Sequence, residues 1–313
     1  MRVAVVDLGT NTTRLLIADV AERRVAELDR RSEITRLGEG VDAGGRLLDG
    51  AIERVFRVLA QYKAAIDEHG AERTTAVATS AVRDAENGED FRHALRDRYG
   101  IEARIITGDE EAQLTFAGAT LERARGGDPL LVLDIGGGST EFVIGRAGEA
   151  PSLHVSTQAG SVRQTERHVH DDPPTDVQLE HMRAEVRSII DAAVPADLRG
   201  SVKDGVAVAG TPTSLAAIDQ QLEPYDSARV HGYRLPLESA ERILRMLASI
   251  PEPERREVKG LHPDRAPTIV AGAVILIESM RAFGLGSMQI GEHDILHGAA
   301  LQAAGVLDGT EHA

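Results

Sequence analysis

Residues Leu131–Gly145 read LVLDIGGGSTEFVIG and place an aspartate, three glycines and a glutamate between two runs of strand-forming residues. Near the N-terminus, Ala4–Ala18 read AVVDLGTNTTRLLIA. A gapless alignment of the two stretches pairs Asp7 with Asp134, Gly9 with Gly136, Thr12 with Ser139, Thr13 with Thr140 and Arg14 with Glu141. Two strands joined by a glycine turn predict a hairpin, and its recurrence at a spacing far beyond solenoid repeats predicts a duplicated domain with two similar lobes.

The glycine-rich turn does not match the common nucleotide-binding loops. A dinucleotide fingerprint needs a third glycine three residues after the second, and then a helix. Here the residue three positions after Gly138 is Glu141, which begins the strand-like EFVIG. A P-loop needs a Gly-Lys-Ser/Thr sequence, and no lysine is near. A strand–turn–strand with tight glycines can instead bind an anion through its backbone N–H groups. Asp134 and Glu141 beside such a turn favour a hard divalent cation, although a plain glycine hairpin with an exposed acid on each side is the alternative.

Composition excludes several classes of protein. The chain has 313 residues, enough for two domains, and a formal net charge of −15, which disfavours binding to nucleic acid. We expect no transmembrane helix and no export signal. Cysteine is absent, which excludes disulfides and thiolate metal sites and fits the cytoplasm. Lysine occurs only three times, so arginine is the main cation for any anion site.

The order of elements is a mixture of strands and helices in which a hairpin opens each half. We expect strands at 2–7, 15–20, 25–31, from 74, 102–107, 130–145 (as a hairpin), 205–209 and 287–291. Helical spacing predicts helices at 50–69, 109–125, 176–193, from 213, 238–250, 268–283 and 293–305, with Gly126, Gly127 and Pro129 ending the second of them.

The successive motifs DLGTNTTRLL, ATSAVRDA, GDEEA, DIGGGSTE, AGTPTSLAA and DRAPTIVAGA resemble those of the exopolyphosphatase and guanosine pentaphosphate phosphohydrolase (Ppx/GppA) family. The resemblance runs from Arg2 to about Ala300 and is closest to the short, two-domain form. It implies an α/β fold of the actin, Hsp70 and sugar kinase superfold, with two duplicated ribonuclease H-like (actin-like ATPase) domains, mixed sheets flanked by helices and an interdomain cleft. We expect domain I at 1–115 plus 297–313 and domain II at 116–296.

The resemblance also implies roles for individual residues. Glu111, the second glutamate of GDEEA, matches the catalytic base, and Asp134, Glu141 and Asp7 match metal-binding acids for Mg²⁺ or Mn²⁺. The expected phosphate-binding residues lie in the two hairpins, beyond the strand at 74, and at a helix N-terminus: Gly9, Thr10, Asn11, Thr12, Arg14, Gly136, Gly137, Gly138, Ser139, Arg83, Thr211, Thr213 and Arg265. Since Arg14 replaces Glu141 in the repeat, we expect the first hairpin to bind substrate and the second to bind metal.

Each of these residues also has a simpler interpretation. Glu110 and Glu111 could only stabilise the first turn of a helix, and a single arginine is more often a surface or ion-pair residue. His293 and His297 are four residues apart, as in a metal-binding helix, but we favour helix capping or polarity at the edge of a cleft. For His168 and His170 beside Asp171 and Asp172 we favour a solvated loop.

The sequence therefore predicts a cytoplasmic, Mg²⁺-dependent exopolyphosphatase that releases terminal orthophosphate from inorganic polyphosphate by attack of water. Conversion of guanosine pentaphosphate (pppGpp) to the tetraphosphate is the alternative within the family. An ATPase or sugar kinase of the same superfold and a non-catalytic binder of polyphosphate or alarmone are the other hypotheses. No nucleic acid or membrane is expected as a partner, and the resemblance allows a homodimer.

Overall fold

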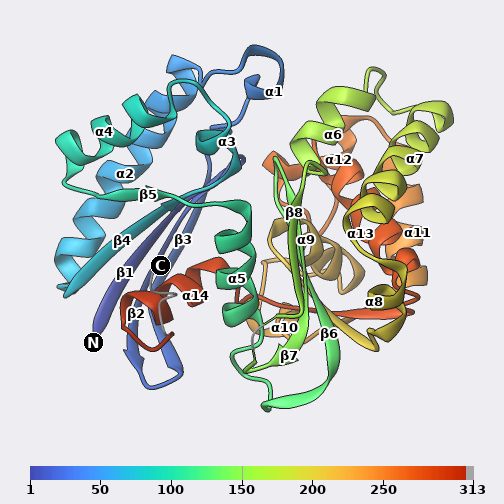
Figure 1. Cartoon of the computed structure of the whole chain (residues 1–313). Coiled ribbons are helices and arrows are strands. Elements are labelled where there is room, and N and C mark those ends of the chain that lie inside the picture. Colours follow the sequence, from blue (N-terminus) through green and yellow to red (C-terminus); the bar gives the residue numbers. More distant parts are fainter. Residues whose placement is uncertain (150, 308–313) are drawn as a thin grey trace. The chain divides into compact units, whose positions relative to one another are not determined.

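The computed structural model describes residues 1–149 and 151–307 (Figure 1). The chain divides into two compact units: Met1–Glu122 together with the segment from His293 onward form unit 1, and Arg123–Glu292 form unit 2. The boundaries expected from the sequence, at 115/116 and 296/297, fall inside helices α5 (Gly108–Ala119) and α14 (Ile295–Ala303). The limits of the functional domains and the cleft between them stay predictions.

Unit 1 contains a five-stranded mixed sheet in the order β3-β2-β1-β4-β5. Its strands are β1 (Arg2–Leu8), β2 (Thr12–Ala21), β3 (Arg24–Ile34), β4 (Arg73–Ala78) and β5 (Ala103–Ile105). Its other helices are α1 (Val41–Gly44), α2 (Asp49–His69), α3 (Ser80–Arg83) and α4 (Gly88–Tyr99). β1 is antiparallel to β2 and parallel to β4, so the glycine hairpin lies at the centre of the sheet.

Alternation along the strands gives this sheet two buried faces. Ala4 and Val6 pack with α2 and α4 in one core, whereas Val3 and Val5 pack with α5 and α14 in another. Helices α5 and α14 approach closely because each has a glycine at the contact. A Cβ atom at Gly118 would lie 2.0 Å from the carbonyl oxygen of Asp294, and one at Gly298 would lie 1.9 Å from that of Leu114. The helix that carries Glu111 is thus held by a helix from the C-terminal segment.

Unit 2 contains a six-stranded mixed sheet in the order β10-β11-β9-β6-β7-β8. Its strands are β6 (Gly126–Ile135), β7 (Thr140–Ala147), β8 (Leu153–Thr157), β9 (Asp204–Val208), β10 (Arg234–Pro236) and β11 (Ser287–Ile290). Its helices are α6 (Ser161–His168), α7 (Asp176–Ala193), α8 (Ala196–Ser201), α9 (Gly210–Asp219), α10 (Ser227–Val230), α11 (Leu237–Ala248), α12 (Glu252–Arg255), the short 3₁₀ helix η1 (Pro263–Arg265) and α13 (Ile269–Ala282).

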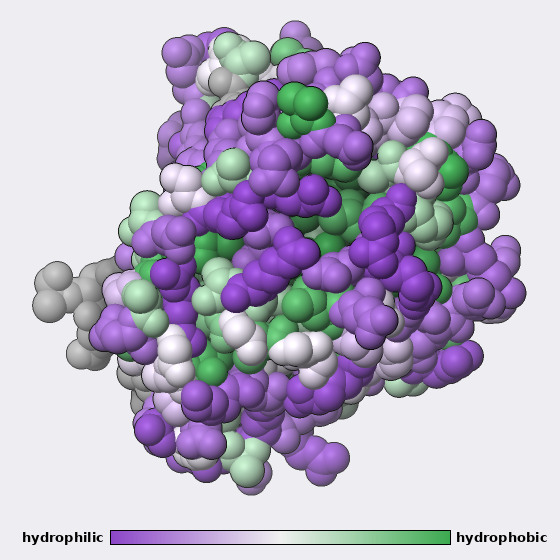
Figure 2. All heavy atoms as spheres, turned by 90° about the vertical axis from the view of Figure 1, so that its right-hand side faces the viewer, coloured by the Kyte–Doolittle hydropathy of each residue, from purple (hydrophilic) through white to green (hydrophobic). Residues whose placement is uncertain are grey.

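The core of unit 2 lies on one face of this sheet. Leu131, Leu133 and Phe142 point into it together with residues of α7, α9, α11 and α13. Because side chains alternate along a strand, Asp134 and Glu141 belong to the opposite face. Figure 2 shows a face of the molecule on the side of α7 and α11, where hydrophilic side chains predominate and hydrophobic ones are scattered among them.

The two sheets confirm the expected α/β fold class and the duplication. In both, the hairpin strands and their antiparallel neighbour occupy the same order, and two parallel strands follow on the other side of the first hairpin strand. This is the ribonuclease H-like arrangement that the resemblance implies. The register is the same too, because Asp7 faces Arg14 in one hairpin and Asp134 faces Glu141 in the other.

One expected element is wrong in extent. The helix predicted at 109–125 ends at Ala119, where the hydroxyl of Thr120 donates to the carbonyl oxygen of Phe116 at 2.8 Å. Gly126, Gly127 and Pro129 do not end this helix but lie in the irregular start of β6, where both glycines have a positive φ. Among the described residues, no helix is both long and apolar enough to cross a membrane.

Candidate functional site

The two hairpin turns are built alike. In the first hairpin (Asp7–Arg14), the backbone N–H of Gly9 donates to the carbonyl oxygen of Thr12 at 3.0 Å. In the second hairpin (Asp134–Glu141), Gly136 donates to Ser139 at the same distance. A Cβ atom at Gly9 would lie 2.9 Å from the Thr12 oxygen, so this turn requires glycine. The expected role of both turns in binding phosphate through their backbone N–H groups stays a prediction.

The first hairpin carries a buried ion pair that extends to α14. Arg14 Nη2 lies 2.6 Å from Asp7 Oδ2, and Nη1 also pairs with Asp294 Oδ2. Both carboxylates are almost fully buried, and the Arg14 side chain is 15% exposed. Burial raises the pKa of Asp7. For Asp294, burial is outweighed by the combined effects of Arg14, His297 and Arg30, which hold the pKa well below its usual range. The structure thus places the expected phosphate ligand Arg14 between two acids.

Asp7 keeps one carboxylate oxygen available. Its Oδ2 accepts hydrogen bonds from Arg14, but its Oδ1 is buried and has no hydrogen-bond partner among the described residues. Buried carboxylate oxygens normally have a partner, so an oxygen of this kind fits a metal ion or a metal-bound water.

The second hairpin carries two acids where the first carries an acid and a base. Asp134 and Glu141 are 6% and 1% exposed and face each other on neighbouring strands. The hydroxyl of Ser156, on β8, donates to Glu141 Oε1 at 2.7 Å. Like charges directly opposite in a sheet destabilise it, and a divalent cation between them removes that repulsion. The buried carboxylate pair therefore fits Mg²⁺ or Mn²⁺, both of which prefer oxygen ligands.

The two glutamates of GDEEA have different environments. Thr107 caps α5, and Glu110 completes the capping box by accepting the Thr107 N–H at 2.9 Å. Glu111 is instead 8% exposed, and its Oε2 accepts a hydrogen bond from Arg83 Nη1 at 3.2 Å. Arg83 also donates to the carbonyl oxygen of Ile106 at 3.0 Å. First-turn stabilisation thus falls to Glu110, and Arg83, expected as a phosphate ligand, contacts the expected base.

Sequence reasoning missed the residues that hold the second turn. The N-terminus of α6 packs directly on the glycines, with the N–H of Val162 donating to Gly137 at 2.9 Å and Arg163 Nε donating to Gly138 at 2.9 Å. A Cβ atom at Gly160 would lie 2.2 Å from the carbonyl oxygen of Gly137. The only sequence signal was a glycine before Ser161, which is too common to be informative.

At α9 the structure brings together the three remaining predicted residues. The guanidinium of Arg265 lies against Gly210, where a Cβ atom would meet Nη1 at 1.5 Å. Thr211 packs on Gly272 of α13, and Thr213 donates its hydroxyl to the carbonyl oxygen of Ala209 at 3.1 Å. An arginine beside a helix N-terminus suits an anion. The phosphate-binding roles of these residues stay predictions.

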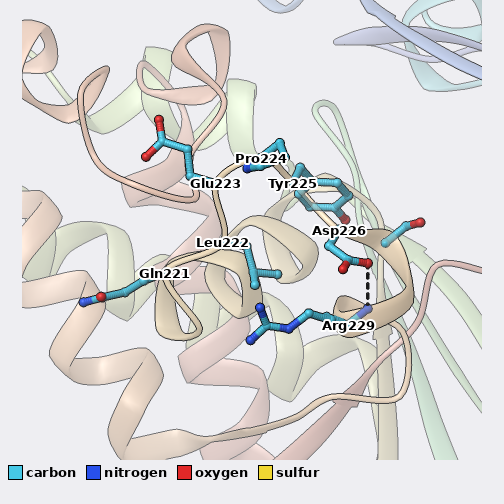
Figure 3. Close-up of a pocket in the computed structure, with 8 residues that line it drawn as sticks. Gln221, Leu222, Glu223, Pro224, Tyr225, Asp226 and Arg229 are labelled. Carbon is cyan, nitrogen blue, oxygen red and sulfur yellow. Dashed lines mark hydrogen bonds between the residues drawn. The ribbon is translucent and has the colours of Figure 1, made fainter.

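Unit 2 also has an open pocket between α9 and α10, lined by Gln221–Ser227 and Arg229 (Figure 3). Asp226 caps α10 by accepting the backbone N–H groups of Ala228 and Arg229. The lining contains none of the residues expected at the functional site, so the geometry does not connect this pocket with the hairpin chemistry.

Comparison with known proteins bears on the whole chain. The Ppx/GppA phosphatase family matches residues 16–304. The chain belongs to this family. Exopolyphosphatase 2 of Mycobacterium tuberculosis is 39% identical to it, over 97% of this chain and 99% of the relative. The crystal structure of an exopolyphosphatase-like protein is 36% identical in sequence, with a TM-score of 0.88. The match covers 96% of this chain and 98% of the chain in that crystal structure. The crystal structure of the Ppx/GppA family member of Aquifex aeolicus is 30% identical, with a TM-score of 0.82. The match covers 100% of this chain and 99% of the Aquifex chain.

Membership in the Ppx/GppA family confirms the resemblance that the sequence motifs indicated. The chain is a phosphatase of phosphoanhydride bonds by family, and it has the fold of solved family members. The roles of the individual side chains rest on their geometry, and they stay predictions.

Proposed function

We propose that this protein is a Mg²⁺-dependent exopolyphosphatase that releases terminal orthophosphate from inorganic polyphosphate. The observation that carries the proposal is the buried carboxylate pair Asp134–Glu141 beside a glycine turn, in a chain whose relatives are named exopolyphosphatases. The proposal places the enzyme in the cytoplasm, in line with a chain without cysteine. The homodimer allowed by the resemblance stays a prediction.

In this mechanism the chain's own groups divide the work. Glu111 accepts a proton from the attacking water, and Arg83 fixes the orientation of that carboxylate. The turn N–H groups and Arg14 neutralise phosphate oxygens. Asp134, Glu141 and Asp7 are the acids that would hold Mg²⁺, and the ion would supply charge neutralisation for the phosphates. A bond forms between the water oxygen and the terminal phosphorus, the bridging P–O bond breaks, and the polymer leaves one phosphate shorter.

The decisive experiment compares two neighbouring glutamates. Phosphate release with Mg²⁺ is measured on polyphosphates of several lengths for wild type, Glu111→Gln and Glu110→Gln. We expect Glu111→Gln to lose about 10²- to 10⁴-fold in kcat, the usual contribution of a general base. Glu110→Gln should stay near wild type, because glutamine also completes a capping box. Equal rates in Glu111→Gln and wild type would remove Glu111 as the base.

The same assay separates the alternatives. Faster turnover of guanosine pentaphosphate than of polyphosphate would assign the other family activity. Phosphorylation of a sugar by ATP, without release of phosphate from polyphosphate, would support a kinase. Tight binding of polyphosphate with no turnover would support a non-catalytic binder.

A further inference from the structure

A second cluster of potential ligands lies in unit 1, among side chains that the proposed reaction does not use. Glu27 lies on β3, His293 immediately precedes the N-cap of α14, and His297 lies in the first turn of that helix. Their ligand atoms all lie within 4.8 Å of one another. His297 Nε2 lies 2.9 Å from Glu27 Oε1, and the two imidazole rings are 4.2 Å apart between centroids.

The two histidines meet because of the way α14 begins. Asp294 is the N-cap, and its Oδ1 accepts the N–H of Leu296 at 3.0 Å. His293 precedes this cap and lies outside the helix, so the extended backbone at Asp294, rather than helical spacing, sets its ring beside that of His297. The three side chains differ in exposure: His297 is fully buried, whereas His293 is 20% exposed and Glu27 is 36% exposed.

The surroundings of His297 suit a metal-bound imidazole. The backbone N–H of Asp294 points at Nδ1 at 3.4 Å, which leaves the ring proton on Nε2, between His297 and Glu27. A cation binds at Nε2 only when the long contact with the Asp294 N–H opens and the ring proton moves to Nδ1. The Asp294 carboxylate lies beside it, with Oδ1 at 4.0 Å from Nδ1. A carboxylate next to the second ring nitrogen is the usual support of a metal-binding histidine.

We propose that Glu27, His293 and His297 form a binding site for Zn²⁺ or Co²⁺, separate from the Mg²⁺ site of the hairpins. Two imidazoles and one carboxylate are a zinc ligand set, and they select against Mg²⁺, which binds oxygen ligands and keeps its waters. Water would complete the coordination of the ion. The chain has no cysteine, so no thiolate competes for a borderline metal.

A second histidine–glutamate pair, which has no third ligand beside it, provides a control for the proposal. In unit 2, His168 Nε2 lies 2.7 Å from Glu185 Oε2, and this histidine is also largely buried. Within the described part of the chain, that pair belongs to no group of three ligands. His168→Gln is therefore the matched control, since it removes a histidine bonded to a glutamate without removing a ligand of the proposed site.

The experiment titrates chelator-treated full-length protein with Co²⁺ in excess Mg²⁺ and follows the visible absorption of four-coordinate cobalt. We expect one equivalent to bind and Zn²⁺ to displace it. His293→Gln and Glu27→Gln should each weaken binding about tenfold or more, whereas His168→Gln should match wild type. Because His297 is buried and its loss could prevent folding, the two more exposed ligands decide the result. Absence of a one-equivalent site in wild type, or wild-type affinity in both variants, would overturn the proposal.

Discussion

The two hairpins differ at one position, and this difference predicts that neutralising an acid changes the stability of the two units in opposite directions. In the first hairpin, Asp7 faces Arg14, and in the second, Asp134 faces Glu141. Replacing Glu141 by glutamine removes one of two like charges and keeps the shape of the side chain. We expect Glu141→Gln to stabilise unit 2 in the absence of divalent metal while it abolishes the stabilisation by Mg²⁺.

The magnitude follows from the spacing of directly opposite side chains. Two unit charges about 5 Å apart, at an effective dielectric constant of about 20, repel by about 3 kcal/mol. Polar neighbours such as the Ser156 hydroxyl, 2.7 Å from Glu141 Oε1, reduce this. A net gain of about 1–2 kcal/mol remains. With a urea dependence of about 2 kcal/mol per M, the unfolding midpoint rises by about 0.5–1 M.

The assay is urea unfolding with EDTA and with saturating Mg²⁺, and Asp7→Asn is the matched control. Asp7 occupies the equivalent hairpin position but pairs with Arg14 at 2.6 Å, so its neutralisation breaks a buried ion pair. We expect it to lower the urea midpoint of unit 1, because the buried Arg14 loses one of its two carboxylate partners. Mg²⁺ should raise the wild-type midpoint because it binds only the folded state. If Glu141→Gln lowers the EDTA midpoint as Asp7→Asn does, the carboxylate pair is not a repulsive cation site.

Three further predictions concern the support of the hairpins and of the sheet. Gly160→Ala places a Cβ atom 2.2 Å from the Gly137 carbonyl oxygen and should reduce kcat/KM at least about tenfold. Gly200→Ala is the control, because nothing lies within 4 Å of its Cβ position, and it should match wild type. Equal activities of the two variants would show that the glycine turn tolerates displacement. Ser156→Ala removes the hydroxyl bonded to Glu141 and should raise the Mg²⁺ concentration for half-maximal activity several-fold, and an unchanged metal titration would contradict this. Burial would raise the pKa of Asp204, but hydrogen bonds from Arg234, the Gly205 N–H and Arg123 outweigh it and lower the pKa. The ionised Asp204 therefore stabilises the folded state at pH values above its unfolded pKa of about 3.9. This stabilisation is lost as the pH falls through the lowered pKa of the folded state. Asp204→Asn should therefore cost about 1 kcal/mol at neutral pH, and the difference from wild type, measured by urea unfolding, should disappear on acidification; a constant difference would refute the linkage.

Local patterns predicted the duplicated hairpin and its register, because alternation and a glycine turn are properties of neighbouring residues. The gapless alignment paired Arg14 with Glu141, and the strands pair each with the expected aspartate. Helices with strong apolar periodicity were also predicted closely: α7 runs Asp176–Ala193 as expected.

What the sequence could not predict depends on contacts between distant segments. Arg14 pairs with Asp294, 280 residues later, and no local pattern marks Asp294 as anything but a helix cap. The α6 contact with Gly137 and Gly138 is likewise tertiary. The distinction between Glu110 and Glu111 depends on burial, because both are first-turn acids and only the approach of Arg83 separates them.

The close contact of α5 with α14 has a consequence for the biosynthesis of the protein. The chain leaves unit 1 after Glu122, builds all of unit 2 and only then returns to supply α14. Unit 2 is continuous and can complete its core as it leaves the ribosome, whereas the sheet of unit 1 must wait for a helix that is made after unit 2. The helix that carries Glu111 has its packing partner only when Gly298 has emerged. A nascent chain thus carries its proposed base early but gains the packing partner of that helix only after all of unit 2 has been made.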